Sequence, residues 1–167
     1  MIKYIGSKRR LVPVLTELFA RSGARTALDL FTGTTRVAQA FKSAGAHVTA
    51  VDSARYSHVL ARTWIAIDAA EIDHPTLQAA IAELDALPGS PGYFTETFCV
   101  RSRFFQPHNG ERIDAVREAI ARDHAGTPLE PILLTSLLLA ADRVDSTTGV
   151  QMAYVKEWAP RSYAELT

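Results

Sequence analysis

A glycine-containing turn and an acidic residue further along the chain are the residues in this sequence whose types and spacing suit chemistry. Residues 29–35 read Asp-Leu-Phe-Thr-Gly-Thr-Thr, and Asp52 ends the next apolar segment. Glycine at position 33 lets the chain turn tightly and lets a ligand approach the backbone. A carboxylate about 20 residues after such a turn can accept hydrogen bonds from both hydroxyls of a ribose. The pattern predicts a site for a ligand that contains a nucleoside.

The composition of the turn narrows the class of ligand. It carries one glycine, Gly33, where a dinucleotide-binding turn has three, so a pyrophosphate cradle is poorly supported. A nucleoside without phosphates, such as S-adenosylmethionine, fits this turn better than NAD. Spacing alone leaves an alternative open, in which Gly33 only turns the chain and Asp52 is a solvated residue at the end of a strand.

The elements that must position this turn are predicted from hydrophobic spacing. Residues 26–31 suit a strand buried on both faces, and residues 47–52 suit a second buried strand. Residues 9–19 have the spacing of a helix with Pro13 in its first turn, and a further helix between the strands ends near Gly45. Strand, turn, helix and strand within about 30 residues make a βαβ unit with parallel strands.

The rest of the chain is predicted to be mostly helical. Apolar stripes indicate helices over residues 56–67 and 77–87, and Asn109 is a candidate N-cap for a third helix. Residues 132–141 suit a helix that is buried nearly all round.

Three segments of the sequence resemble the adenine-specific DNA methyltransferases of the Dam-like group. Residues 3–8 (Lys-Tyr-Ile-Gly-Ser-Lys) resemble the opening motif of that family, and residues 29–34 resemble its Asp-Leu-Phe-x-Gly-Ser/Thr cofactor motif. Asp52 falls where the family has its ribose-binding acidic residue. The order of the three segments also matches the family.

The resemblance implies a fold and a division of the chain. The fold class is α/β, a partial Rossmann-like methyltransferase fold followed by a mostly helical target-recognition insert. Residues 1–53 would form the S-adenosylmethionine-binding part, and residues 54–167 the target-recognition region. The implied activity is site-specific transfer of a methyl group from S-adenosylmethionine to the exocyclic amino group of adenine in double-stranded DNA, as in restriction–modification systems.

The resemblance also assigns residues. The implied cofactor-binding residues are Tyr4, Gly6, Lys8, Asp29, Phe31, Gly33, Thr34 and Asp52. The implied DNA-binding residues are Lys8, Arg9 and Arg143, the last within residues 142–149, which resemble a DNA-contacting loop of the family although Asp145 stands where asparagine is usual. The alternative for residues 8–10 is the solvated start of a helix.

The residues that perform the methyl transfer in this family are missing from the sequence. The family uses an Asp-Pro-Pro-Tyr motif, and neither Asp-Pro-Pro nor Asn-Pro-Pro occurs in the 167 residues. Only two strands are predicted, and a sheet of that size is too small to cover helices on both faces. We therefore assign no catalytic residue, and we expect a second chain or a C-terminal part to supply the catalytic motif.

Composition excludes several other classes of protein. The net charge is zero, which does not by itself indicate nucleic-acid binding, so local clusters of basic residues matter more than the total. Cys99 is the only cysteine and is interpreted as a buried filler, and the five histidines lack the spacing of metal ligands, so no metal is expected. No apolar run is long enough to span a membrane, and we expect a cytoplasmic protein.

Two other functions remain open at this point. A methyltransferase acting on a small molecule would use the same turn, and a non-catalytic helical DNA-binding or assembly module would not need the cofactor.

Overall fold

The computed structural model describes residues 8–149 and 153–167, which divide into two compact units. The N-terminal unit comprises the described residues up to Ile72, and the helical unit comprises those from Asp73 onward. Each unit has its own elements and is described separately. The functional division expected from the sequence, with cofactor binding in residues 1–53 and target recognition in residues 54–167, stays a prediction.

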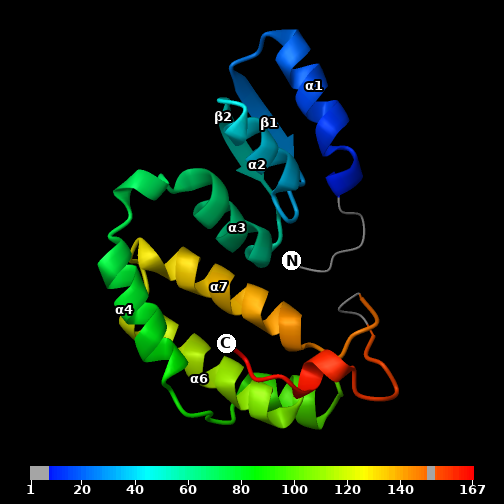
Figure 1. The fold of residues 1–167 in the computed structure, drawn as a ribbon, viewed down its shortest axis with the longest axis vertical. Helices are drawn as coiled ribbons and strands as arrows, with labels where there is room; N and C mark the ends of the chain where they lie inside the picture. The colour runs from blue at the N-terminus through cyan, green and yellow to red at the C-terminus, as the bar shows by residue number, and fades with distance from the viewer. Residues whose placement is uncertain (1–7, 150–152) are drawn as a thin grey trace. The chain divides into compact units, whose positions relative to one another are not determined.

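The N-terminal unit has the predicted order of helix, strand, helix and strand, followed by further helical turns (Figure 1). Its elements are η1 (Lys8–Arg10), α1 (Val12–Ser22), β1 (Thr26–Leu30), α2 (Arg36–Ser43), β2 (His47–Val51), α3 (Arg55–Ala61), η2 (Arg62–Ala66) and η3 (Ala69–Glu71). The helix predicted over residues 56–67 is therefore an α-helix that continues as one π-helical segment, η2.

Local sequence explains where these elements begin and end. Pro13 lies in the first turn of α1, where its missing N–H leaves no hydrogen bond unmade. Gly23 follows α1 and Gly45 follows α2, both with the positive φ (67° and 87°) that ends a helix in the left-handed region. Phe19 of α1 stacks on Phe41 of α2 at 4.8 Å between ring centroids, which fixes the two helices against each other.

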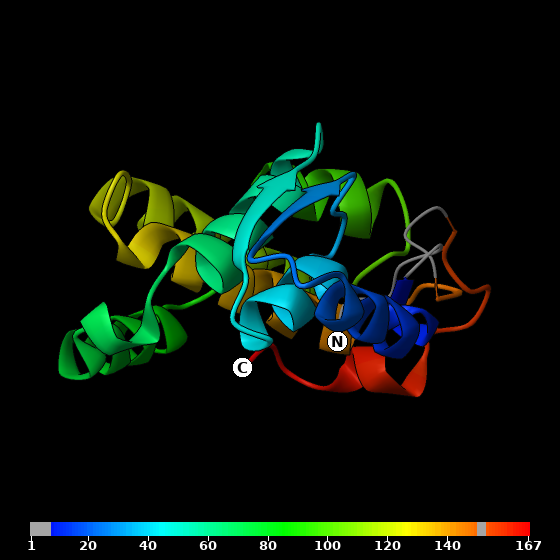
Figure 2. The same cartoon turned by 90° about the horizontal axis from the view of Figure 1, so that it is seen from above.

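The two strands form a parallel sheet whose register runs from Thr26 opposite His47 to Leu30 opposite Val51. Helix α2 packs on one face of this sheet, as Figure 2 shows. On the other face Leu28 and Leu30 are 61% and 53% exposed. The prediction that β1 is buried on both faces is therefore wrong, because among the described residues of this unit no second layer covers the sheet.

The helical unit contains no strand longer than a single bridge among its described residues. Its elements are α4 (His74–Asp85), α5 (Tyr93–Thr95), η4 (Glu96–Val100), α6 (Pro107–Asp123), α7 (Leu129–Val144) and η5 (Pro160–Tyr163). The core lies between α4, α6 and α7, where Ala80, Ile120 and Leu133 pack together. Helix α7 is only partly buried along residues 132–141, because Ser136 is exposed and its leucines are mostly half-buried.

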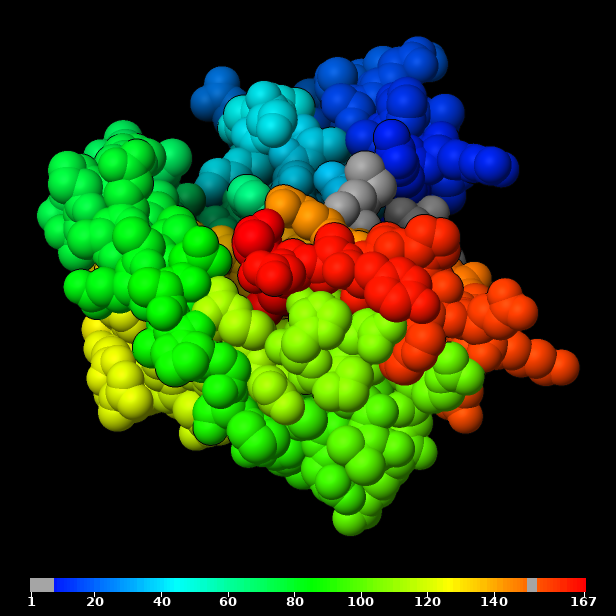
Figure 3. Space-filling model, turned by 60° about the horizontal axis from the view of Figure 1, so that its bottom comes forward, coloured from blue at the N-terminus to red at the C-terminus, as the bar shows by residue number. Residues whose placement is uncertain are grey.

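Asn109 holds the C-terminal segment against α6 instead of capping that helix. The prediction of an N-cap at Asn109 is wrong, because Pro107 already occupies the first turn and the helix begins there. The buried Asn109 amide donates to the carbonyl oxygens of Ser162 (3.2 Å) and Ala164 (2.9 Å) and accepts from the N–H of Leu166 (2.9 Å). Figure 3 shows the C-terminal segment, in red, lying across the surface of α6.

None of the helices in the described residues is long and apolar enough to cross a membrane.

We predict that Asn109→Ala lowers the free energy of unfolding by about 2–4 kcal/mol, because three backbone groups, two of them in buried residues, lose their partner. Urea unfolding measures this change, and amide exchange in residues 160–166 should accelerate in the variant. Gln78→Ala, on the exposed side of α4, is the control and should change the free energy by less than about 0.5 kcal/mol. An equal effect of the two substitutions would contradict the role given to Asn109.

Candidate functional site

The candidate site is the turn between β1 and α2, at the carboxyl ends of the two parallel strands. The N–H of Thr32 donates to the carbonyl oxygen of Val51 at 3.0 Å, so the turn stays joined to the end of β2. Phe31 and Thr35 adopt positive φ values of 58° and 60°. Such values cost a non-glycine residue on the order of 1 kcal/mol and persist only where the surrounding structure enforces them.

Asp29 provides much of that enforcement. Its carboxylate is buried and accepts hydrogen bonds from the Thr32 hydroxyl (2.8 Å) and the N–H of Ala38 in α2 (3.2 Å). It therefore holds the turn and the first residues of the helix together. Sequence reasoning placed Thr32 at the turn but missed its hydrogen bond to Asp29 and the role of Ala38, although a threonine three residues after an aspartate is a spacing that allows this bond.

Lys8 joins the N-terminal basic residues to the same turn. Its ammonium group lies 3.7 Å from Asp29 Oδ1 and donates a hydrogen bond to the carbonyl oxygen of Phe31 at 3.0 Å. The carbonyl that Lys8 binds belongs to a residue in the left-handed conformation. Lys8 therefore stabilises the unusual backbone of the turn as well as the buried carboxylate.

Asp52 lies at the end of β2 and binds the turn directly. Its Oδ2 accepts from the N–H of Gly33 at 2.8 Å, and its Oδ1 accepts from the N–H of Ala54 at 2.9 Å. The N–H groups of Ala54 and Gly33 lower the pKa of Asp52 below its usual value, against a smaller opposing effect of burial. The hydroxyl of the buried Ser57 makes no hydrogen bond of normal geometry. It lies near Asp52 and contributes least to the lowering of the Asp52 pKa.

This carboxylate retains the capacity to bind a ligand. An ionised carboxylate offers about four lone-pair sites, and the N–H groups of Gly33 and Ala54 use two of them at Asp52, with the Ser53 N–H and the Ser57 hydroxyl near enough to lower its pKa as well. Asp52 is half-buried, so the remaining sites can accept hydroxyl groups from outside. The arrangement suits a ligand with two neighbouring hydroxyls, as in a ribose.

The structure brings most of the sequence-predicted cofactor residues into one place. Lys8, Asp29, Phe31, Gly33, Thr34 and Asp52 all lie at or beside the turn between β1 and α2. Tyr4 and Gly6 lie outside the described residues. Their roles in binding a cofactor stay predictions.

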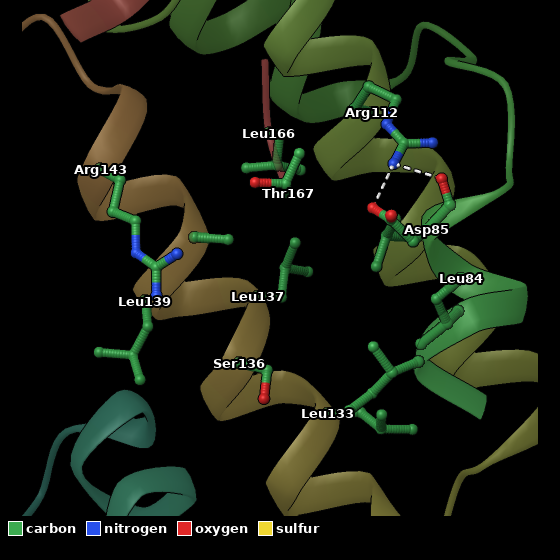
Figure 4. A pocket seen from close by; sticks show the side chains of 13 residues that line it. Leu84, Asp85, Arg112, Leu133, Ser136, Leu137, Leu139, Arg143, Leu166 and Thr167 are labelled. Atoms are coloured by element: carbon green, nitrogen blue, oxygen red, sulfur yellow. Dashed lines mark hydrogen bonds and ion pairs between the residues drawn. The ribbon is translucent and has the colours of Figure 1, made fainter. Parts of the chain in front are cut away.

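The predicted DNA-binding residues are divided between the two units. Lys8 and the exposed Arg9 lie in η1 of the N-terminal unit, and the exposed Arg143 lies in the last turn of α7 in the helical unit. Arg143 borders a mostly apolar groove of about 280 Å³ between α4, α6 and α7 (Figure 4). The Arg112–Asp85 ion pair, at 3.3 Å, lies on the opposite side of the groove.

The loop that resembles a DNA-contacting segment is held mainly by contacts inside the helical unit. Asp145 is buried and accepts from Arg161 Nε and from the Thr147 hydroxyl, both at 2.7 Å. Ser146 is also buried, and its hydroxyl accepts from the N–H of Ala159 at 3.0 Å. Asp145 therefore has a structural role in this loop.

Cys99 is buried, which confirms its interpretation as a filler. Burial is the main cause that raises the pKa of its thiol to about 12, and the nearby Asp114 carboxylate contributes. A thiol with such a pKa is not a nucleophile at neutral pH. The described residues contain no group of three or more His, Cys, Asp or Glu side chains arranged to hold a metal ion.

A parallel β-α-β unit with an ionised carboxylate bound to its glycine turn defines an α/β protein. Residues 4–167 match the family described as D12 class N6 adenine-specific DNA methyltransferase. The chain belongs to this family. No solved structure matches it.

Three curated relatives are named as type II methyltransferases or as a modification methylase. The type II methyltransferase M.NlaIII of Neisseria lactamica is 32% identical over 93% of this chain, and the modification methylase StsI of Streptococcus sanguinis is 27% identical over 99%. The type II methyltransferase M.CviAII of Paramecium bursaria Chlorella virus 1 is 38% identical over 49% of the chain. The matched segments span 49% of the first relative and 28% of each of the other two.

We predict that Asp52→Asn makes the protein less stable at neutral pH and that this difference shrinks in acid. Because the folded pKa of Asp52 is lowered, its contribution is complete above the unfolded value of about 3.9 and is lost as the pH falls through the folded pKa. Urea unfolding of both proteins between pH 2.5 and pH 7 measures the difference. A difference that is the same at every pH would show that the folded pKa is not lowered.

Proposed function

We propose that this chain binds S-adenosylmethionine at the turn between β1 and α2, as part of an enzyme that methylates the exocyclic amino group of adenine in DNA. The observation that carries the proposal is the Asp52 carboxylate, bonded at 2.8 Å to the N–H of Gly33 at the carboxyl edge of two parallel strands. Ligands of α/β proteins bind at this edge, and membership of the family favours this cofactor over other nucleosides.

The proposed roles follow from the geometry of the turn. Asp52 accepts the two ribose hydroxyls with the lone pairs that its backbone partners leave unused. Phe31 is 79% exposed, so one face of its aromatic ring can pack on the ligand. Asp29 and Lys8 keep the turn in shape, and Thr34 lines it. Tyr4 and Gly6 belong to the proposed site through the family resemblance alone.

The chain's own part in the reaction is to bind and orient. S-adenosylmethionine supplies, when bound, a methyl group activated by a sulfonium. The described residues hold the nucleoside end and fix its orientation, which is a prerequisite for in-line attack by the weakly nucleophilic amino group of adenine. Since no Asp-Pro-Pro or Asn-Pro-Pro occurs in the 167 residues, we propose that groups outside this sequence grip the target base.

Contact with double-stranded DNA is proposed for the basic residues Lys8, Arg9 and Arg143, with residues 54–167 as the region that recognises the target. The net charge of the chain is zero, so these cations would not attract DNA over a long distance. Their contacts with phosphates would instead fix the position of a duplex that is already bound. A cytoplasmic location is consistent with action on DNA and is part of the same proposal.

Calorimetric titration of S-adenosylmethionine into the chain tests the cofactor site. We predict that Asp52→Ala weakens binding at least about tenfold, because the hydrogen bonds to the ribose are lost. Asp68→Ala is the matched control, since Asp68 also lies in the N-terminal unit and also accepts from the N–H two residues ahead, at 3.0 Å to Ala70. A folded wild-type chain that does not bind, or equal losses in the two variants, would contradict the proposal.

The salt dependence of duplex binding tests the basic residues. If Arg143 contacts a phosphate, Arg143→Ala should reduce the slope of log K against log salt by about one, whatever the DNA sequence. Arg117→Ala provides the comparison, because Arg117 is also exposed but is paired with Glu118 at 2.6 Å on α6. Unchanged slopes in both variants would remove Arg143 from the proposed interface.

A further inference from the structure

The zero net charge of the chain divides into opposite charges on its two compact units. Residues 8–72 contain nine Lys and Arg against five Asp and Glu, which gives a net charge of +4. Residues 73–167 contain eight against thirteen, which gives −5. Charges further apart than about 8 Å are largely screened at physiological salt, so a polyanion in contact with the N-terminal unit meets mainly the positive charge of that unit.

The two units also differ in how their arginines are paired. Five of the seven arginines of the helical unit form ion pairs with carboxylates, namely Arg101 with Glu96, Arg112 with Asp85, Arg117 with Glu118, Arg122 with Asp123 and Arg161 with Asp145. In the N-terminal unit, Arg10, Arg25, Arg36 and Arg55 have no ion pair or side-chain hydrogen bond with a described residue. These four charges are available to a partner outside the chain.

Three of these four arginines come from different elements that meet at one edge of the sheet. Arg36 is the first residue of α2, directly after the turn that follows β1. Arg55 is the first residue of α3, shortly after the end of β2. Arg10 ends η1, which Lys8 joins to the same turn. We call Arg10, Arg36 and Arg55 the carboxyl-edge arginines, because the two parallel strands end at this edge.

The carboxylates at this edge already have other partners. Asp29 is buried, and its Oδ1 lies 3.7 Å from the Lys8 ammonium group. Asp52 binds backbone N–H groups, and neither α2 nor α3 has an acidic residue in its first turn. Three guanidinium groups without a carboxylate partner suit a ligand that carries repeated negative charge, and the planar donor fork of arginine matches phosphate.

We propose that the carboxyl-edge arginines form a phosphate-binding surface for double-stranded DNA, and that the N-terminal unit supplies most of the favourable electrostatic free energy of duplex binding. The helical unit, with a net charge of −5, then contributes to target recognition and not to this general affinity. The inference rests on the proposed action on DNA. It does not require that the turn after β1 binds a cofactor.

A second copy of the chain is a poorer partner for this surface than a duplex. The acidic helical unit of another copy is the one part of the chain with a complementary net charge. Five of its carboxylates are already paired with arginines of the same unit. A duplex instead presents one negative charge for about every 1.7 Å of its axis.

The test measures the affinity of the 167-residue chain for a fluorescently labelled duplex by anisotropy at several salt concentrations. Arg36→Ala and Arg55→Ala should each reduce the slope of log K against log salt by about one, and replacing all three carboxyl-edge arginines should reduce it by about three. All variants should unfold at the temperature of the wild type, because these side chains make no bond in the free chain.

Arg25→Ala is the matched control. Arg25 is exposed, belongs to the same unit and has no partner among the described residues, so its removal changes the net charge equally. It precedes β1, however, and lies at the opposite end of that five-residue strand, about 17 Å from the carboxyl edge. The slope should therefore stay as in the wild type. Arg36→Lys and Arg55→Lys keep the positive charge and should retain the wild-type slope, since counterion release depends on charge.

Four results would overturn the proposal. Equal reductions by Arg25→Ala and Arg36→Ala would show an effect of net charge without a local site. A wild-type slope in all three single variants would place the phosphate contacts elsewhere and leave the proposed action on DNA intact. Self-association at low salt that the same substitutions abolish would make a second copy the occupant. A folded wild-type chain that binds no duplex at low salt would contradict the proposed action on DNA as well.

Discussion

The hydrogen bond between the Asp52 carboxylate and the N–H of Gly33 is the interaction on which the candidate site depends. It joins the end of β2 to the turn that follows β1, so the carboxyl ends of the two parallel strands are held together. The same carboxylate also binds the N–H of Ala54 and so fixes the start of the next segment. Because these backbone groups favour the ionised form, a negative charge stands beside the glycine turn at neutral pH.

The helical unit relies on buried polar side chains that bind backbone groups. Burial by itself would raise the pKa of Asp114, but hydrogen bonds from Thr95, Phe94 and Gly92 outweigh that effect and lower the pKa. Asn109 serves the C-terminal segment in the same manner. Apolar packing between helices is largely non-directional, whereas these bonds specify which loop lies against which helix. A few buried polar side chains, such as Asp114 and Asn109, therefore determine where the loops of this unit lie.

The sequence predicts most of the N-terminal unit because its signals are local. Strand length, Pro13 and the glycines after α1 and α2 mark the elements, and Gly33 with Asp52 marks the turn. The exposure of Leu28 could not be predicted, since an apolar strand has the same composition whether or not a second layer covers it. The contacts of Asn109 and Asp145 could not be predicted, because their partners, Leu166 and Arg161, lie many residues away. Contacts of that range leave no periodic pattern in a sequence.

The left-handed conformations of Phe31 and Thr35 have a consequence for the thermodynamics of recognition. Thr35 is buried, and its hydroxyl accepts from the Gln39 amide at 2.7 Å, so the turn holds a conformation that these residues seldom adopt without support. A loop that is ordered before its ligand arrives loses little conformational entropy on binding. Because the folding of the unit has already ordered this backbone, ligand binding does not include the loss of conformational entropy that ordering the loop would require.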